Sequence, residues 1–84
     1  MKKSASILSV DDERLVNEAV AKLLGAKYSV TTVPSGQQCL DTVVGVKPDL
    51  ILMDVSMPGM DGYATCRKLK EDPATSTIPV IFIS

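Results

Sequence analysis

Acidic residues follow two apolar segments of this sequence, at the point where each segment ends. Asp11 and Asp12 come directly after the stretch Ser6–Val10, and Asp54 closes the apolar run Leu50–Met53. Carboxylates that meet in one crevice repel one another, and a hard cation such as Mg²⁺, which binds carboxylate, water and phosphate oxygens, removes that repulsion. Two chemistries therefore fit: a bare magnesium site, or a carboxylate nucleophile that accepts a phosphoryl group beside the cation. The short Pro/Gly turn after Asp54 leaves room for such a group and favours the second.

Apolar strand patterns and helical patterns alternate along the chain, and their arrangement must bring these acids together. Such alternation predicts an α/β fold with a parallel sheet and right-handed crossovers. Ligands of open parallel sheets collect at the carboxyl ends of the strands. Asp11, Asp12 and Asp54 fall at such ends, and Ser84 follows the last strand, where its hydroxyl could donate to a phosphoryl group. The predicted strands are 6–10, 28–33, 50–53 and 78–83, and the predicted helices are 13–24, 35–45 and 62–70.

Local signals support the predicted helices. Ser35 followed by Gln38 fits a capping box, and Asp61 is placed to cap the third helix. In the first helix, apolar residues at helical spacing form one stripe, as expected for a helix that packs on a sheet. Its members are Leu15, Val16, Ala19, Val20, Leu23 and Leu24.

Composition narrows the class of protein further. The 84 residues predict one small domain, and the net charge of -1 offers no basic patch, so direct binding to nucleic acid is not expected. No apolar run approaches the length of a membrane span, and we expect a soluble, cytoplasmic protein without membrane contact. Cys39 and Cys66 lie among apolar neighbours and are interpreted as reduced core thiols.

Three segments, taken together, strongly resemble the receiver domain of two-component response regulators. They are Ile7–Glu13, Asp49–Gly62 and Ile78–Ser84, which occur in the right order and spacing through nearly the whole chain, and the Met-Pro-Gly-Met-Asp-Gly loop that begins at Met57 is especially specific. The resemblance implies a flavodoxin-like open parallel sheet, β-α-β-α-β-α-β with strand order 2-1-3-4. It implies a signalling domain and not an enzyme, beyond self-directed phosphoryl transfer and autodephosphorylation.

The resemblance also implies roles for single residues. Asp54 would be the phosphoacceptor, taking its phosphoryl group from a sensor histidine kinase, a phosphotransfer protein or a small phosphodonor. Asp12 would ligate Mg²⁺ directly, Asp11 would support it through water, and Asp54 and the backbone carbonyl of Ser56 would add ligands. The Ser84 hydroxyl would turn toward the phosphoryl group and signal its presence. Each residue has a simpler alternative, since two acids can merely favour a helix N-terminus and Ser84 can be an uninformative terminal residue.

Residues 1–84 depart from the family in one respect. The match implies a receiver domain truncated after the fourth strand, without the last helix-strand-helix and without the family's lysine that pairs with the phosphorylated aspartate. We therefore expect impaired switching, and an exposed fourth strand and an uncovered sheet face that favour a homo-oligomer. The alternative function is a non-switching interaction module that acts through dimerisation. An aspartyl-phosphate phosphohydrolase is disfavoured because Ser56 stands where that chemistry needs a second acid.

Overall fold

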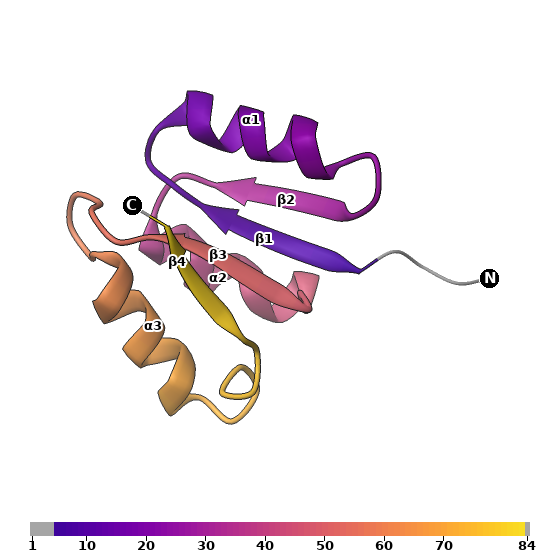
Figure 1. The fold of residues 1–84 in the computed structure, drawn as a ribbon. Helices are drawn as coiled ribbons and strands as arrows, with labels where there is room; N and C mark the ends of the chain where they lie inside the picture. Colours follow the sequence, from indigo (N-terminus) through magenta and orange to yellow (C-terminus); the bar gives the residue numbers. More distant parts are fainter. Residues whose placement is uncertain (1–4, 84) are drawn as a thin grey trace.

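A computed structural model describes residues 5–83 and contains a four-stranded, fully parallel sheet with strand order β2-β1-β3-β4 (Figure 1). The predicted fold class and strand order are confirmed. The second and fourth strands begin later than predicted, at Ser29 and Val80. In chain order the elements are β1 (Ser6–Val10), α1 (Arg14–Leu24), β2 (Ser29–Val33), α2 (Gly36–Val46), β3 (Leu50–Asp54), α3 (Gly62–Glu71) and β4 (Val80–Ile83).

The register of the sheet aligns the carboxyl ends of its two central strands. Val10 of β1 pairs with Val33 of β2 on one side and with Met53 of β3 on the other. Because the strands are parallel, the residues that follow Val10 and Met53 leave the sheet at the same edge. Asp11 and Asp54 are those residues.

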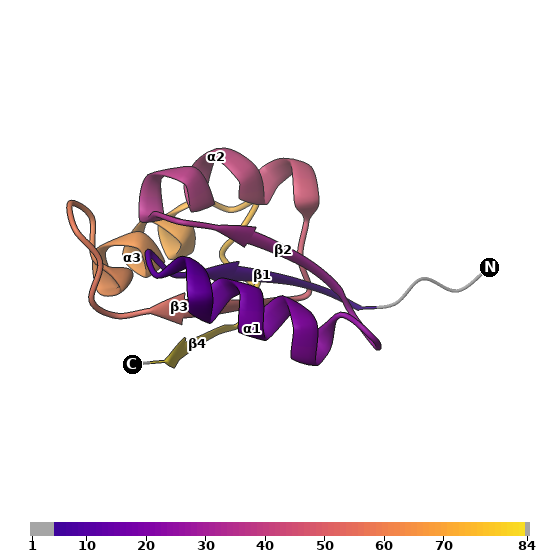
Figure 2. The same ribbon diagram turned by 90° about the horizontal axis from the view of Figure 1, so that it is seen from above.

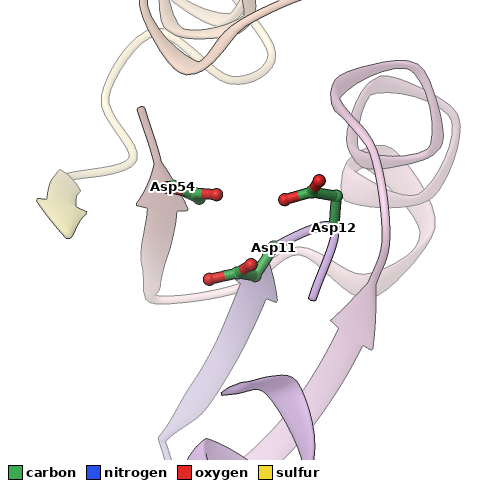
Figure 3. Close-up of side chains that lie close together, drawn as sticks. All are labelled: Asp11, Asp12 and Asp54. Carbon is green, nitrogen blue, oxygen red and sulfur yellow. The ribbon is translucent and has the colours of Figure 1, made fainter. Parts of the chain in front are cut away.

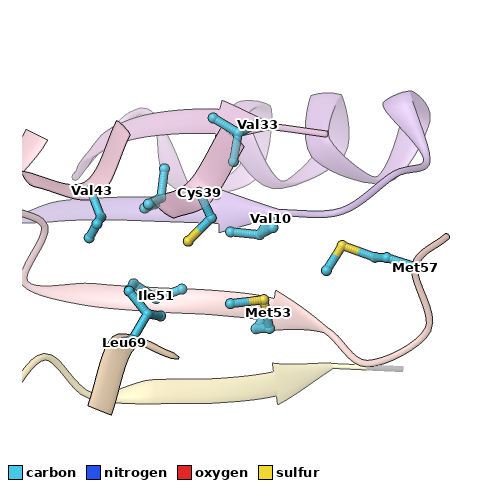
Figure 4. Packing of buried hydrophobic residues seen from close by; sticks show 9 residues of the cluster. Val10, Val33, Cys39, Val43, Ile51, Met53, Met57 and Leu69 are labelled. Atoms are coloured by element: carbon cyan, nitrogen blue, oxygen red, sulfur yellow. The ribbon is translucent and has the colours of Figure 1, made fainter. Parts of the chain in front are cut away.

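Helices cover the two faces of the sheet unequally. Helix α1 lies on one face, over β1 and β2, while α2 and α3 pack together on the opposite face (Figures 1 and 2). The main core lies between the sheet and the α2–α3 pair (Figure 4). It takes alternate residues from the central strands, because successive strand side chains point to opposite faces. Its buried members are Leu8, Val10, Val33, Cys39, Val43, Ile51, Met53, Met57 and Leu69.

The apolar stripe predicted for α1 is buried along one edge only. Leu15 and Leu23 are 74% and 79% exposed, and the buried residue of this helix is Asn17. The helix is rotated so that Val16, Val20 and Leu24 are partly buried while the rest of the stripe faces outward. On the side of α1 that faces the sheet, the Asn17 side chain makes three hydrogen bonds that an apolar side chain could not make.

The ends of α2 and α3 follow the local signals. Ser35 Oγ accepts a hydrogen bond from the backbone N–H of Gln38 at 3.1 Å, and Asp61 Oδ1 accepts one from Ala64 at 2.8 Å, which confirms both predicted N-caps. Helix α2 ends at Val46, and its C-cap residue Lys47 has a left-handed φ of 52°. Within residues 5–83, each helix is too short or too polar to cross a bilayer.

Candidate metal centre

Three carboxylates meet at the edge of the sheet where β1 and β3 end. Asp11, Asp12 and Asp54 each offer one oxygen, and these oxygens all lie within 4.8 Å of one another. The side chains point toward a common space from two separate strand ends (Figure 3). The structure therefore brings together the three acids that the sequence predicted to be neighbours.

Backbone hydrogen bonds fix Asp11. Its N–H donates to the carbonyl of Val33 at 3.1 Å, which extends the pairing of β1 and β2 by one residue. Its carboxylate Oδ1 accepts the backbone N–H of Glu13 at 2.9 Å, and this bond turns the chain into α1. Asp11 is 5% exposed, whereas Asp12 beside it is exposed. One acid is thus built into the sheet edge and the other reaches into solvent.

Asp54 is the last residue of β3 and is partly buried. Its Oδ1 accepts the backbone N–H of Ser56 at 3.3 Å. The N–H of Val55 donates to Ile83 of β4 at 3.3 Å, and Val55 in turn accepts from Gly62 at 2.9 Å. Asp54 therefore leads into a loop whose two ends are joined by a hydrogen bond. Ser56 is exposed and is linked to the cluster by the hydrogen bond that its N–H donates to Asp54. Ser84 lies outside the described residues.

Gly62 supports the site in a way that the sequence interpretation missed. A Cβ atom placed on Gly62 would overlap the backbone carbonyl oxygen of Asp54 and would lie 3.0 Å from the Cα of Val55. The start of α3 can approach the end of β3 only because this residue has no side chain. The signal in the sequence was the presence of a second glycine in this loop. The first, Gly59, has a left-handed φ of 77°.

Asn17 is the second residue that was missed. It is 6% exposed, and its side chain points from α1 toward the ends of β1 and β2. Its amide nitrogen donates to the carbonyls of Asp11 and Val33, both at 3.0 Å. Its amide oxygen accepts the hydroxyl of the buried Ser9 at 2.8 Å. A lone amide within an apolar helical pattern was the signal in the sequence, but its direction depended on how the helix is rotated.

The three acids lack a basic partner in the part of the chain that the structure describes. The ion pair found among residues 5–83 joins Arg14 and Glu18 on the surface of α1, at 3.4 Å. A groove of about 410 Å³ opens beside Asp11 and Asp12, between α1 and the end of β2. Two of the three acids, Asp11 and Asp12, therefore place negative charge next to accessible space.

This donor set fits Mg²⁺. The ion takes carboxylate oxygens at about 2.0–2.1 Å, so oxygens on opposite sides of it lie about 4.2 Å apart. The observed upper limit of 4.8 Å is close to that separation, and small side-chain adjustments or one bridging water would close the difference. Asp11, Asp12 and Asp54 are the residues that would hold the ion. A softer metal is a poorer fit because the cluster contains neither histidine nor cysteine.

Comparison with known proteins identifies the class. The family model of the response regulator receiver domain matches residues 7–84. The chain is 50% identical over 82 residues to "Response regulator PleD" of Caulobacter vibrioides, and 40% identical over 80 residues to the phosphate regulon transcriptional regulatory protein PhoB of Pseudomonas aeruginosa. These alignments cover 96% and 94% of this chain. The chain belongs to the response regulator receiver domain family.

Solved structures give the same fold. The N-terminal domain of a response regulator receiver protein from Methanoculleus marisnigri superposes with a TM-score of 0.91 at 38% identity, over 94% of this chain and 65% of that one. The receiver domain of a histidine kinase from Syntrophus aciditrophicus gives 0.89 at 39% identity, over 96% and 62%. The chain spans 18% of PleD and 35% of PhoB. Receiver domains are signalling domains that bind Mg²⁺ at an acidic pocket, and the cluster of Asp11, Asp12 and Asp54 corresponds to that pocket.

Proposed function

We propose that Asp54 accepts a phosphoryl group from a sensor histidine kinase or a phosphotransfer protein, with Mg²⁺ held by the acidic cluster. The observation that carries the proposal is the 4.8 Å clustering of Asp11, Asp12 and Asp54 at the carboxyl edge of a receiver-type sheet. Asp54 is the nucleophile because it ends a central strand and is followed by a largely exposed loop. Because the kinase draws its phosphoryl group from ATP, we place the transfer in the cytoplasm.

The transfer exchanges one bond to phosphorus for another. The Oδ2 atom of Asp54 attacks the phosphorus, the P–N bond to the donor's imidazole breaks, and the imidazole nitrogen leaves with the electron pair. The product is an acyl phosphate on Asp54. The Ser56 N–H, bonded to Oδ1 at 3.3 Å, restrains the carboxylate during attack. A bound Mg²⁺ supplies charge neutralisation for the phosphoryl oxygens and for the acids.

Metal ligation and signalling divide among the neighbouring residues. Asp12 would be the direct ligand of the ion, Asp11 would support it through water, and Asp54 and the Ser56 carbonyl would add further oxygens. The hydroxyl of Ser84 would turn toward the phosphoryl group and signal its presence through a conformational change. Any chemistry beyond this is self-directed, namely acceptance of the phosphoryl group and its later hydrolysis.

Acetyl phosphate tests the proposal without knowledge of the kinase. The chain is incubated with acetyl phosphate and Mg²⁺, and intact-mass spectrometry reports the gain of one phosphoryl group. Asp54→Asn should abolish that gain. Asp41→Asn, which removes an equal charge from an exposed position on α2, should leave it unchanged. Lack of modification in the wild-type chain, or modification that persists in Asp54→Asn, would contradict the proposal.

A second candidate function is a non-switching interaction module, and the edge of the sheet favours it. Strand β4 pairs with β3 on one side, and its Ile81 and Phe82 are 50% and 37% exposed. Leu15 and Leu23 of α1 are exposed as well, on the face of the sheet that α1 covers in part. Unpaired strand edges and exposed apolar side chains promote association. We propose that the 84-residue chain forms a homo-oligomer through β4 or through this face.

Light scattering across a concentration series tests the association. The mass should rise from monomer with concentration, and Ile81→Lys should shift the equilibrium toward monomer. Beryllofluoride with Mg²⁺ separates the two functions, because amide NMR shifts near Asp54 are expected for a switching receiver and not for the interaction module. A monomer at all concentrations argues against the association alone and leaves the phosphoacceptor proposal intact.

A further inference from the structure

The buried side chain of Asn17 joins three separate parts of the chain. Its amide nitrogen donates to Asp11 at the end of β1 and to Val33 at the end of β2, while its oxygen accepts from Ser9 within β1. Ser9 is fully buried and Asn17 is 6% exposed. Each polar atom of the amide is therefore satisfied in a dry environment, where an unmade hydrogen bond is costly.

One of these bonds acts on the backbone of the acidic cluster. The carbonyl of Asp11 belongs to the peptide unit that connects Asp11 to Asp12, and Asn17 holds it at 3.0 Å. The Val33 carbonyl receives both Asn17 and the N–H of Asp11. Asp11 is thereby held on both sides, through its N–H and its carbonyl. The direction in which the exposed Asp12 leaves the sheet depends on the same peptide unit.

Packing alone does not explain an amide at this position. Helix α1 lies over β1 and β2, where an apolar side chain would avoid the desolvation of an amide. The polar choice gains what an apolar residue cannot provide, a fixed orientation of the backbone next to the acids. Groups that orient metal ligands from outside the ligand set commonly change metal affinity when they are replaced.

We propose that Asn17 is a positioning residue for the cation site: it holds the Asp11–Asp12 peptide so that both carboxylates face Asp54. The inference rests on the proposed function, in that it requires the acidic cluster to bind Mg²⁺. It assigns a role to a side chain that touches neither the cation nor the phosphoryl group.

Calorimetric titration with Mg²⁺, at a temperature where each variant is fully folded by circular dichroism, tests the role. Asn17→Ala should weaken Mg²⁺ binding about tenfold, the lower end of the range for groups that orient metal ligands. Thr75→Ala is the matched control. Thr75 is 2% exposed and donates to the Leu69 carbonyl at 2.6 Å, in the segment that precedes β4 at the opposite edge of the sheet. Its loss should lower stability and leave Mg²⁺ affinity within about twofold of wild type, because outer contacts act only on the ligands they touch.

The possible outcomes distinguish a failure of the Asn17 role from a failure of the proposed function. A wild-type chain that does not bind Mg²⁺ overturns the proposed function. Wild-type binding together with an unchanged affinity in folded Asn17→Ala overturns the positioning role and leaves the function standing. If Asn17→Ala does not fold, Asn17→Leu takes its place, since it fills the space of the amide and removes both donor bonds, to Asp11 and to Val33. It should weaken binding in the same direction, and an unchanged affinity there also overturns the role.

Discussion

Replacing Asp54 by asparagine should make the metal-free protein more stable. The three acids of the cluster hold oxygens within 4.8 Å of one another, and residues 5–83 provide them with no basic partner. The introduced amide would keep a carbonyl oxygen that accepts the Ser56 N–H while losing the charge. The substitution therefore removes repulsion from two neighbours and leaves the local backbone bond in place.

The geometry sets the size of the effect. Two unit charges at this separation repel by about 1 kcal/mol at the dielectric constant of water and by about 3.5 kcal/mol at an effective value of 20. The lower figure applies, because Asp12 is exposed and solvent screens it. With two pairs relieved, we expect a gain of about 1–2 kcal/mol in the free energy of unfolding. A domain of this size gains about 4–8 °C in Tm per kcal/mol, so the Tm should rise by about 5–15 °C.

Thermal unfolding with EDTA, with Mg²⁺ and at high salt tests the reasoning. Asp54→Asn should exceed wild type in EDTA, and the difference should shrink at about 1 M salt, where the screening length falls to about 3 Å. Mg²⁺ should raise the Tm of wild type more than that of the variant, since binding stabilises the state that binds. Asp41→Asn removes an equal charge on the exposed face of α2 and should change little. Equal Tm values for Asp54→Asn and Asp41→Asn in EDTA would refute the electrostatic argument.

Two further predictions concern packing and burial. Gly62→Ala should destabilise the fold by about 1–3 kcal/mol in urea unfolding, because the added Cβ would overlap the Asp54 carbonyl. The control is Gly45→Ala on α2, whose Cβ would meet no atom within 4 Å and which should stabilise the fold by about 0.5–1 kcal/mol. A similar change in stability at both positions would contradict the close contact at Gly62. Burial raises the pKa of the Cys39 thiol from 9.0 to about 11. Below about pH 9 the thiol is protonated in both the native and the unfolded state. Between about pH 9 and pH 11 the unfolded chain loses the proton and the native chain keeps it, so the free energy of unfolding falls as the pH rises. Across that window the fall should be about 2–3 kcal/mol larger in wild type than in Cys39→Ala. Parallel pH profiles for the two proteins would show that this thiol does not contribute.

The acidic cluster could be predicted from the sequence because its geometry is a property of the backbone. Parallel strands must present their carboxyl ends at one edge, so acids after two adjacent strands become neighbours whatever their side-chain conformations. The register between Val10 and Met53 confirms this reasoning for Asp11 and Asp54. The roles assigned to Ser56 and to the three acids remain predictions, as does the role of Ser84.

The supporting residues could not be predicted in the same way, because they depend on how elements turn against one another. The helical pattern of α1 allowed a wide apolar arc, and nothing in that pattern told Leu15 or Leu23, both exposed, from their partly buried neighbours. The direction of Asn17 follows from the carbonyls it meets at the ends of β1 and β2, which belong to other parts of the chain. Hydrophobic periodicity predicts which side of a helix is apolar on average, and it does not predict where one buried amide side chain points.

Because the backbone fixes where the acids lie, a cluster of repelling carboxylates can persist in a small fold. Side-chain rotation can reduce the repulsion among the acids, but moving Asp11 away from Asp54 would require the backbone of β1 or β3 to move. That backbone is restrained by the sheet register and by the bonds of Asn17 to Asp11 and Val33. The repulsion is therefore relieved by binding a cation more readily than by rearranging the chain, which is the property that a site for a doubly charged ion and a phosphoryl group requires.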